Sequence, residues 1–173
     1  SPFGFAELKI DGRLYGGWKT VSVTRSIEQV AGTFSLDVTD RWGGSAAAWP
    51  IKPGARAQLL LDGDTVIDGY VDDAEPSYDS QNAGLRVAGR DRTGDLVDCS
   101  AIYKTGQWRG ATLDRIARDL IAPFGIGLRV EADVGEPFAS YAIQEGETVF
   151  ECLERAARMR AVLLVSDTAG NLV

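Results

Sequence analysis

Acidic side chains in one short stretch, "VAGRDRTGDLVDCS" at residues 87–100, have a spacing that could support chemistry. If this stretch were helical, Asp91, Asp95 and Asp98 would project from one face, because residues three and four positions apart are neighbours on a helix. Clustered carboxylates of that kind are what a metal site or an acid–base pair requires. Gly94 lies between the first two carboxylates and weakens a helix through them, so the stretch also suits a turn.

The charges beside Asp91 favour the turn. Arg90 and Arg92 flank it and supply counter-charge, whereas a calcium loop needs oxygen ligands at alternate positions in a set order. We therefore expect residues 87–100 to form a strand end and a capped turn with Asp–Arg pairing, and a short helical turn over 93–98 is compatible with this. These carboxylates are then structural.

A second acidic cluster lies between residues 62 and 75, in "DGDTVIDGYVDDAE", and its members are Asp62, Asp64, Asp68, Asp72, Asp73 and Glu75. One interpretation is a cation site or an acidic lining. The other is a set of turn carboxylates and solvated strand faces, which is the more common role of such residues.

Two tryptophans stand in a segment rich in Gly, Pro and small residues, "RWGGSAAAWPIKPG" at 41–54, which predicts a long loop. Trp42 and Trp49 are candidate interface residues, because tryptophan is enriched at the energetic centres of protein interfaces. The alternative is that one or both fold back over the open end of a barrel.

Several chemistries are excluded by residue type. The sequence has no histidine, which removes Ser-His-Asp, Cys-His and HExxH sites, and its two cysteines, Cys99 and Cys152, form no CxxC pattern. "GRDRTGD" lacks the Lys-Ser/Thr ending of a phosphate-binding loop. The motifs therefore predict no enzyme, no metal site and no cofactor.

Charge and hydropathy restrict the partners. The net charge of −7 and the pI near 4.6 argue against a surface that grips a phosphate backbone, so a protein partner is favoured. The longest apolar runs are far below the roughly 20 residues that span a bilayer. The first ten residues also lack the pattern of a secretory signal.

Period-two alternation from residue 5 to about 89 predicts short antiparallel strands, and therefore a small all-β barrel or sandwich. Tight turns are expected at Asp11-Gly12, which supplies the positive φ of a hairpin, and at 62–64. A further strand pair is expected around an Asn82-Ala83-Gly84 turn.

Helical periodicity begins after Gly94. One amphipathic helix is predicted from the N-cap Thr112 to a stop at Pro123 and Gly125, and a second begins at a Thr148/Glu151 capping box. Arginines in these regions are expected on solvated, salt-bridged helix faces: Arg109, Arg115, Arg118, Arg155, Arg158 and Arg160. Residues 162–173 predict a strand, a turn and the start of a return strand, so we expect the protein to continue beyond Val173.

Four segments together resemble a known family. They are "DGRLYGGWKTVSVTRSIEQVAGTFSLDVTD", "VAGRDRTGDLVDCSAIY", "GQWRGATLDRIARDLIAPFGI" and "ETVFECLERAARMRAVLLVSDTAGNLV". In this order they resemble the baseplate hub proteins of Mu-like contractile-tailed phages. That family is related to the late-control D proteins and to the hub portion of type VI secretion spike proteins.

The resemblance implies a mainly β fold with an α+β part. A tail-tube-like antiparallel β-barrel is expected over residues 1–95, a smaller mixed α/β domain, present in part, over 96–173, and a second barrel beyond the chain end. A homotrimer would then form a pseudo-sixfold ring that joins the sixfold tail tube to the threefold central spike.

The resemblance also implies partners and a location. They are a second and third copy of the protein, the tail spike protein, the tail tube protein and other baseplate proteins, in the virion tail baseplate after assembly in the host cytoplasm. DNA would pass through the ring without specific binding, and negative lining residues, for which Asp62, Asp64, Asp72 and Asp73 are candidates, would repel it.

A different class of function is a carbohydrate-binding or cell-wall-hydrolysing tail-tip module. Binding would use Trp42 and Trp49 as stacking residues. Hydrolysis would need two carboxylates facing each other across a cleft, roughly 5 to 10 Å apart.

Overall fold

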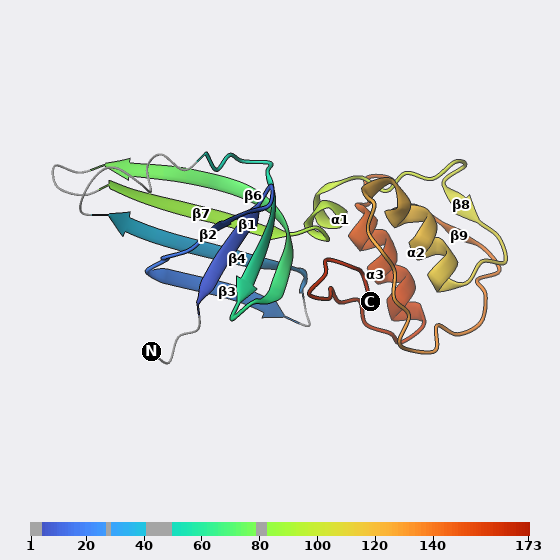
Figure 1. Ribbon diagram of the computed structural model, residues 1–173. Coiled ribbons are helices and arrows are strands. Elements are labelled where there is room, and N and C mark those ends of the chain that lie inside the picture. The colour runs from blue at the N-terminus through green and yellow to red at the C-terminus, as the bar shows by residue number, and fades with distance from the viewer. Residues whose placement is uncertain (1–4, 27–28, 41–49, 79–82) are drawn as a thin grey trace. The chain divides into compact units, whose positions relative to one another are not determined.

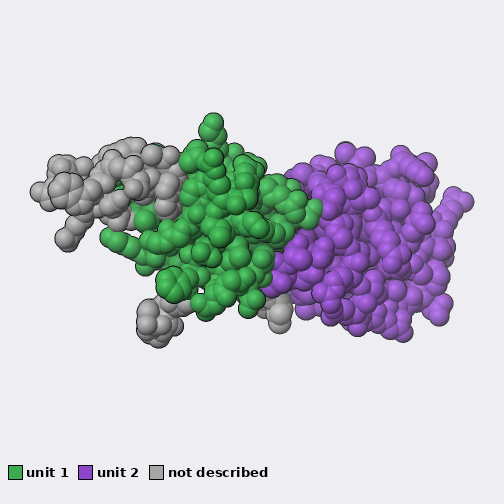
Figure 2. Space-filling model, in the orientation of Figure 1, with its two compact units in different colours: residues 1–26, 32–92 green, residues 27–31, 93–173 purple. Residues whose placement is uncertain are grey.

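The computed structural model describes residues 5–26, 29–40, 50–78 and 83–173 (Figure 1). The chain forms two compact units, shown in different colours in Figure 2. The first unit holds residues 1–26 and 32–92, and the second holds residues 27–31 and 93–173. The fold is mostly β, with a smaller helical part, as the sequence predicts.

A seven-stranded sheet dominates the first unit, with the order β2-β1-β5-β6-β7-β4-β3 (Figure 1). The ladders that join β2, β1, β5, β6, β7 and β4 are antiparallel. The strands are β1 (Ala6–Ile10), β2 (Arg13–Tyr15), β3 (Thr20–Ser26), β4 (Gln29–Asp40), β5 (Arg56–Leu61), β6 (Asp64–Tyr78) and β7 (Ala83–Asp91).

Two tight hairpins confirm the predicted turn chemistry. Asp11 and Gly12 have φ values of 49° and 78° between β1 and β2, and Asp62 and Gly63 have 52° and 88° between β5 and β6. Two successive positive φ values define the turn whose twist matches that of the flanking strands, which is why Asp-Gly is favoured there.

Strand β6 pairs with β5 on one side and with β7 on the other. Its residues 64–70 pair with β5 and its residues 69–78 pair with β7, and the ladder with β7 has a register shift between Val71 and Asp73. An extra residue of this kind bends a strand and increases its twist. The predicted turn at Asn82-Ala83-Gly84 is wrong in its placement, since Ala83 and Gly84 lie in β7 and pair with Tyr78 and Ser77, while Asn82 lies outside the described residues.

One apolar core collects the inward side chains of the first unit. Alternate positions face it on each strand, as Leu8 and Ile10 do on β1 and Val87 and Leu85 on β7. Its buried residues are Leu8, Ile10, Tyr15, Phe34, Leu36, Ile51, Ala57, Leu59, Ile67, Val71, Leu85 and Val87.

The second unit is mixed α/β (Figure 1). Its helices are α1 (Gly94–Asp98), α2 (Leu113–Ile121), the short 3-10 helix η2 (Ala122–Phe124) and α3 (Val149–Met159), and β8 (Gln107–Trp108) pairs with β9 (Tyr141–Ala142). Helix α2 begins after Thr112 and its continuation stops at Gly125, whose φ is 64°, as the sequence predicts. Arg109 and Arg160, expected on helices, instead follow β8 and end α3.

Helix α3 carries the predicted capping box. Thr148 Oγ1 accepts a hydrogen bond from the Glu151 N–H at 3.2 Å, and Glu151 Oε2 accepts one from the Thr148 N–H at 2.9 Å. These bonds satisfy two backbone donors at the helix start. The inner face of α3 buries Val149, Cys152, Leu153, Ala156 and Ala157.

The last residues form a short hairpin. Val165 and Val173 exchange backbone hydrogen bonds of 3.0 and 2.8 Å. The predicted strands are reduced to isolated bridges, from Leu172 to Ser166 and to Leu128. Asp167 closes the turn by accepting hydrogen bonds from the Ala169 and Asn171 N–H groups, each at 2.9 Å.

Candidate functional site

The three carboxylates of residues 87–100 do not share a face. Asp91 ends β7, whereas Asp95 and Asp98 lie on α1. Asp91 is 1% exposed, its Oδ2 accepts a hydrogen bond from the Gly32 N–H at 3.1 Å, and it lies 4.0 Å from the guanidinium of Arg25. The strand end and short helical turn are confirmed, and the carboxylate is engaged in holding backbone.

Two ion pairs at this strand end join residues that are distant in the sequence. Arg25 approaches Asp91 from β3, and Arg90 pairs across the sheet with Asp72, at 3.4 Å. Adjacent side chains on a strand point to opposite faces, so Arg90 and Asp91 are presented to different partners.

The candidate acidic lining occupies two places in the first unit. Asp62 and Asp64 flank Gly63 at the β5–β6 turn, whereas Asp72 and Asp73 lie at the bend of β6, and all four are exposed. Asp64 and Asp72 are eight positions apart on β6, which is about 26 Å of contour length at ~3.3 Å per residue. The four therefore form two local patches, one at each place.

Two of these four carboxylates have partners. Asp62 Oδ1 accepts a hydrogen bond from the Phe5 N–H at 3.1 Å, which fixes the start of the chain's first strand against the turn. Asp72 pairs with Arg90. The tryptophan loop cannot be compared in the same way, because Trp42 and Trp49 lie outside the described residues.

Asp68 is a buried carboxylate whose role the sequence does not reveal. It is 6% exposed, accepts a hydrogen bond from Gln58 Nε2 at 3.0 Å, and lies 3.4 Å from the Nε of Arg56. A two-residue turn at Asp62-Gly63 would set Ile67 opposite Gln58. The register shift between Leu59 and Leu60 sets Asp68 there instead.

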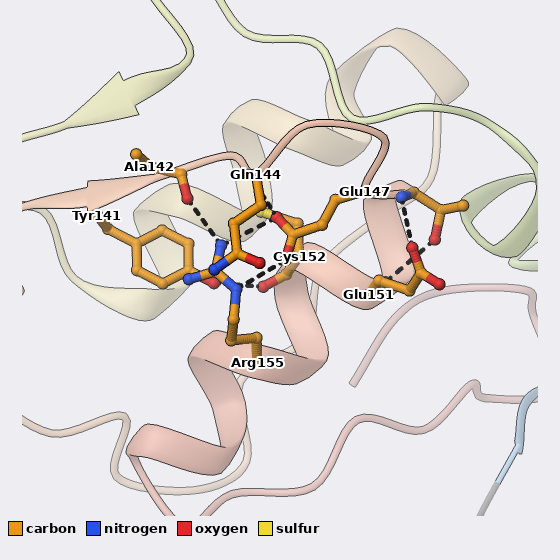
Figure 3. Close-up of polar contacts among 8 residues, drawn as sticks. Tyr141, Ala142, Gln144, Glu147, Glu151, Cys152 and Arg155 are labelled. Atoms are coloured by element: carbon orange, nitrogen blue, oxygen red, sulfur yellow. Dashed lines mark hydrogen bonds and ion pairs between the residues drawn. The ribbon is translucent and has the colours of Figure 1, made fainter.

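A polar network of the second unit surrounds Arg155 on α3 (Figure 3). Its Nε and Nη2 donate to the two carboxylate oxygens of Glu147 at 2.7 and 2.9 Å, and Nη2 also donates to the Ala142 carbonyl at 2.7 Å. The guanidinium lies over the ring of Tyr141, 4.4 Å from its centroid. Tyr141 in turn donates to the Cys152 carbonyl at 2.6 Å.

The pKa values in this network describe a structural cluster. The hydrogen bond from Arg155 lowers the pKa of Glu147, although partial burial opposes the shift, and Glu147 stays ionised. Burial raises the pKa of the Cys152 thiol to about 11, and burial also raises that of Tyr141. A nucleophile or general base needs the opposite shift, so neither group is activated at neutral pH.

A second cluster ties α2 to an aromatic stack. Trp108 Nε1 donates to Asp119 Oδ2 at 3.0 Å, Arg115 donates to the same oxygen at 3.1 Å, and the Tyr103 ring stacks on Trp108 at 4.3 Å. Burial raises the pKa of Asp119, but the hydrogen bonds from Trp108 and Arg115 outweigh it and lower the pKa. This arrangement fixes side chains and leaves no carboxylate poised to donate a proton.

The outer face of α3 has a shallow depression of about 460 Å³, lined by Glu151, Glu154, Arg155, Arg158 and Met159. Its charges are mostly neutralised in pairs, since Arg158 donates to Glu154 at 2.7 Å and Arg155 binds Glu147. Across the described residues, no group of three or more His, Cys, Asp or Glu side chains could hold a metal ion. In the same part of the chain, no helix has the length and apolar character to cross a membrane.

Two family models match the chain in consecutive order. Residues 6–91 match the N-terminal domain of the Mu phage baseplate assembly protein GpP-like family, and residues 93–173 match the second domain of the baseplate hub protein gp44-like family. The baseplate hub protein gp44 of Escherichia phage Mu is 44% identical over 169 residues, which cover 96% of this chain and 44% of that protein.

Solved structures show the same similarity. The 43 kDa tail protein of prophage MuSo2 from Shewanella oneidensis is 46% identical, with a TM-score of 0.92 over 98% of this chain and 53% of that one. A tail protein of Neisseria meningitidis shares the fold at 23% identity and a TM-score of 0.83, covering 99% of this chain and 50% of that one. The E. coli protein c3393, described as a component of the type VI secretion system, shares the fold more distantly, at 11% identity and a TM-score of 0.55 over 90% of this chain and 38% of that one. The chain thus spans about half the length of these relatives or less.

Proposed function

Because the chain belongs to the baseplate hub protein family of Mu-like phage tails, we propose that it forms part of the hub at the centre of a contractile-tail baseplate. The observation that carries this proposal is the ordered match of both domains, over residues 6–91 and 93–173, together with 44% identity to a baseplate hub protein. The protein acts in the virion, after assembly with other baseplate components in the host cytoplasm.

In this role the protein is an adaptor. Three copies form a ring that joins the sixfold tail tube to the threefold central spike and leaves a channel for DNA. The fold is compatible with the proposal, because a seven-stranded sheet with one core has strands and turns on its outside that can contact other subunits of a ring.

The role is structural rather than catalytic. The sequence has no histidine, and the Cys152 thiol, with a pKa of about 11, is protonated at neutral pH. The most buried carboxylates of the described residues, Asp68 and Asp91, hold backbone and side chains in place. These features support an assembly protein over a hydrolase.

The exposed acids of the first unit serve as lining residues of the channel in this proposal. Like charge repels a DNA duplex and prevents it from adhering during ejection. We expect Asp64→Lys and Asp73→Lys together to slow DNA ejection from particles. Glu136→Lys, which makes the same charge change at an exposed residue of the second unit, is the control. Unchanged ejection kinetics in the double variant would remove the lining role.

Light scattering tests the adaptor role, with the protein in the full length that the phage makes. A trimer that binds a trimeric spike protein supports the hub. A stable monomer that ignores the spike refutes it, and binding of cell-wall glycan by that monomer would identify a carbohydrate-binding tail-tip module instead.

A further inference from the structure

The first residues of strand β4 lie outside its ladder with β7. The pairs that join β4 to β7 begin at Thr33 and Arg90. Before that point, Asp91 Oδ2 accepts the hydrogen bond of the Gly32 N–H at 3.1 Å, and Thr93 Oγ1 donates to the Val30 carbonyl at 2.9 Å. Side chains at and beyond the end of β7 thus bond the backbone groups that a longer ladder would have paired.

Both of these side chains are buried. Asp91 is 1% exposed and Thr93 is 0% exposed. A buried carboxylate or hydroxyl is costly unless it is hydrogen-bonded, so the two residues hold this backbone conformation against its alternatives. Gly32 suits the site, because an added Cβ would lie 3.2 Å from Arg25 Cγ and 3.4 Å from the Thr24 carbonyl oxygen.

Strand β4 therefore contributes buried side chains to two different cores. Phe34 and Leu36 belong to the core of the first unit. Val30, only 2% exposed, belongs instead to the core of the second unit, with Leu96 of α1 and the buried faces of α2 and α3. Ala31 packs against the same core.

We propose that the second unit reaches its full stability only with Val30 in its core, and that Asp91 and Thr93 hold the start of β4 in the backbone conformation that places Val30 there. The family model of the second domain begins at residue 93 and so omits Val30. The hub role and this dependence are separate, since the dependence concerns how the chain folds.

Native-state hydrogen exchange of the full chain tests the dependence. Val30→Ala leaves a cavity in the second core, so we expect amide protection in α2 and α3 to fall on the order of tenfold or more. Val38→Ala is the matched control, since Val38 lies on the same strand but packs against the first core. It should lower protection in β7 and leave that of α3 unchanged.

A second pair of variants tests the hydrogen bond from Thr93 to the Val30 carbonyl. Thr93→Val removes the hydroxyl that bonds the Val30 carbonyl and should reproduce the loss of protection in α3, whereas Thr93→Ser, which keeps the hydroxyl, should restore most of it. The proposal is overturned if Val30→Ala lowers protection only in β4 and β7. An equal fall in both units for Val30→Ala and Val38→Ala would also overturn it, because the chain would then unfold as one body.

Discussion

The network around Arg155 predicts how much the second unit depends on one side chain. Arg155→Met keeps most of the stem of the side chain but removes three hydrogen bonds, two to Glu147 and one to the Ala142 carbonyl, and the contact over the Tyr141 ring. Glu147 would keep its bond from the Gln144 N–H at 2.8 Å but lose its counter-charge.

The magnitude follows from the degree of burial. The Arg155 and Glu147 side chains are 25% and 11% exposed, so the pair lies between two well-characterised cases. An exposed ion pair contributes about 0 to 1 kcal/mol, and breaking a buried pair costs about 3 to 5 kcal/mol. We therefore expect Arg155→Met to lower the free energy of unfolding of the second unit by about 2 to 3 kcal/mol.

Urea unfolding followed by the helical circular dichroism signal provides the assay, because the described helices all lie in the second unit. Arg118→Met is the matched control. Its i,i+4 pair with Asp114, at 3.0 Å and with the arginine side chain 59% exposed, should contribute less than about 0.5 kcal/mol. If Arg155→Met is no more destabilising than Arg118→Met, the network does not stabilise the unit and the reasoning is wrong.

Three further predictions concern the second unit. The exposed Cys99 should react quickly with a thiol reagent in the native protein, while Cys152, buried and with its pKa raised to about 11, should react only on unfolding; two fast thiols per chain would contradict this. Thr148→Ala should cost about 1 kcal/mol, measured by urea unfolding, and Thr148→Ser, which keeps the capping oxygen, should cost much less. The pKa of Glu147 is lowered in the folded state, so its contribution to stability is present above its ordinary pKa of 4.5 and is lost as the pH falls through the lower folded value. Glu147→Gln should therefore flatten the acid side of the curve of unfolding free energy against pH. An unchanged slope would refute the shift.

Local chemistry made several elements predictable from the sequence. The Asp11-Gly12 and Asp62-Gly63 turns depend on the residues that tolerate positive φ, and the capping box depends on two side chains three residues apart. Helical periodicity likewise predicted that α2 and α3 are amphipathic helices, because the spacing of apolar residues alone indicates such a helix. The resemblance to baseplate hub proteins could also be recognised from four sequence segments in order, and 44% identity to such a protein confirms it.

Other features depend on residues that are distant in the sequence. The register shift that sets Asp68 opposite Gln58 arises from a bulge between Leu59 and Leu60. The turn residues of this hairpin do not predict that bulge. The Glu147–Arg155 pair arises where the segment before α3 folds back on it, so its partners lie eight positions apart and outside the usual helical spacing.

The roles of Asp91 and Thr93 were decided by the tertiary structure alone. Both residues stand in a stretch whose composition predicts a strand end and a turn, and that prediction is confirmed. Their partners, however, are the Gly32 N–H and the Val30 carbonyl, which lie 59 and 63 positions away. The sequence by itself determined the local elements, because turns, caps and amphipathic faces depend on residues that are near one another in the sequence. The burial of Asp91 and Thr93 and the identity of their hydrogen-bond partners depend instead on which strands the sheet brings together.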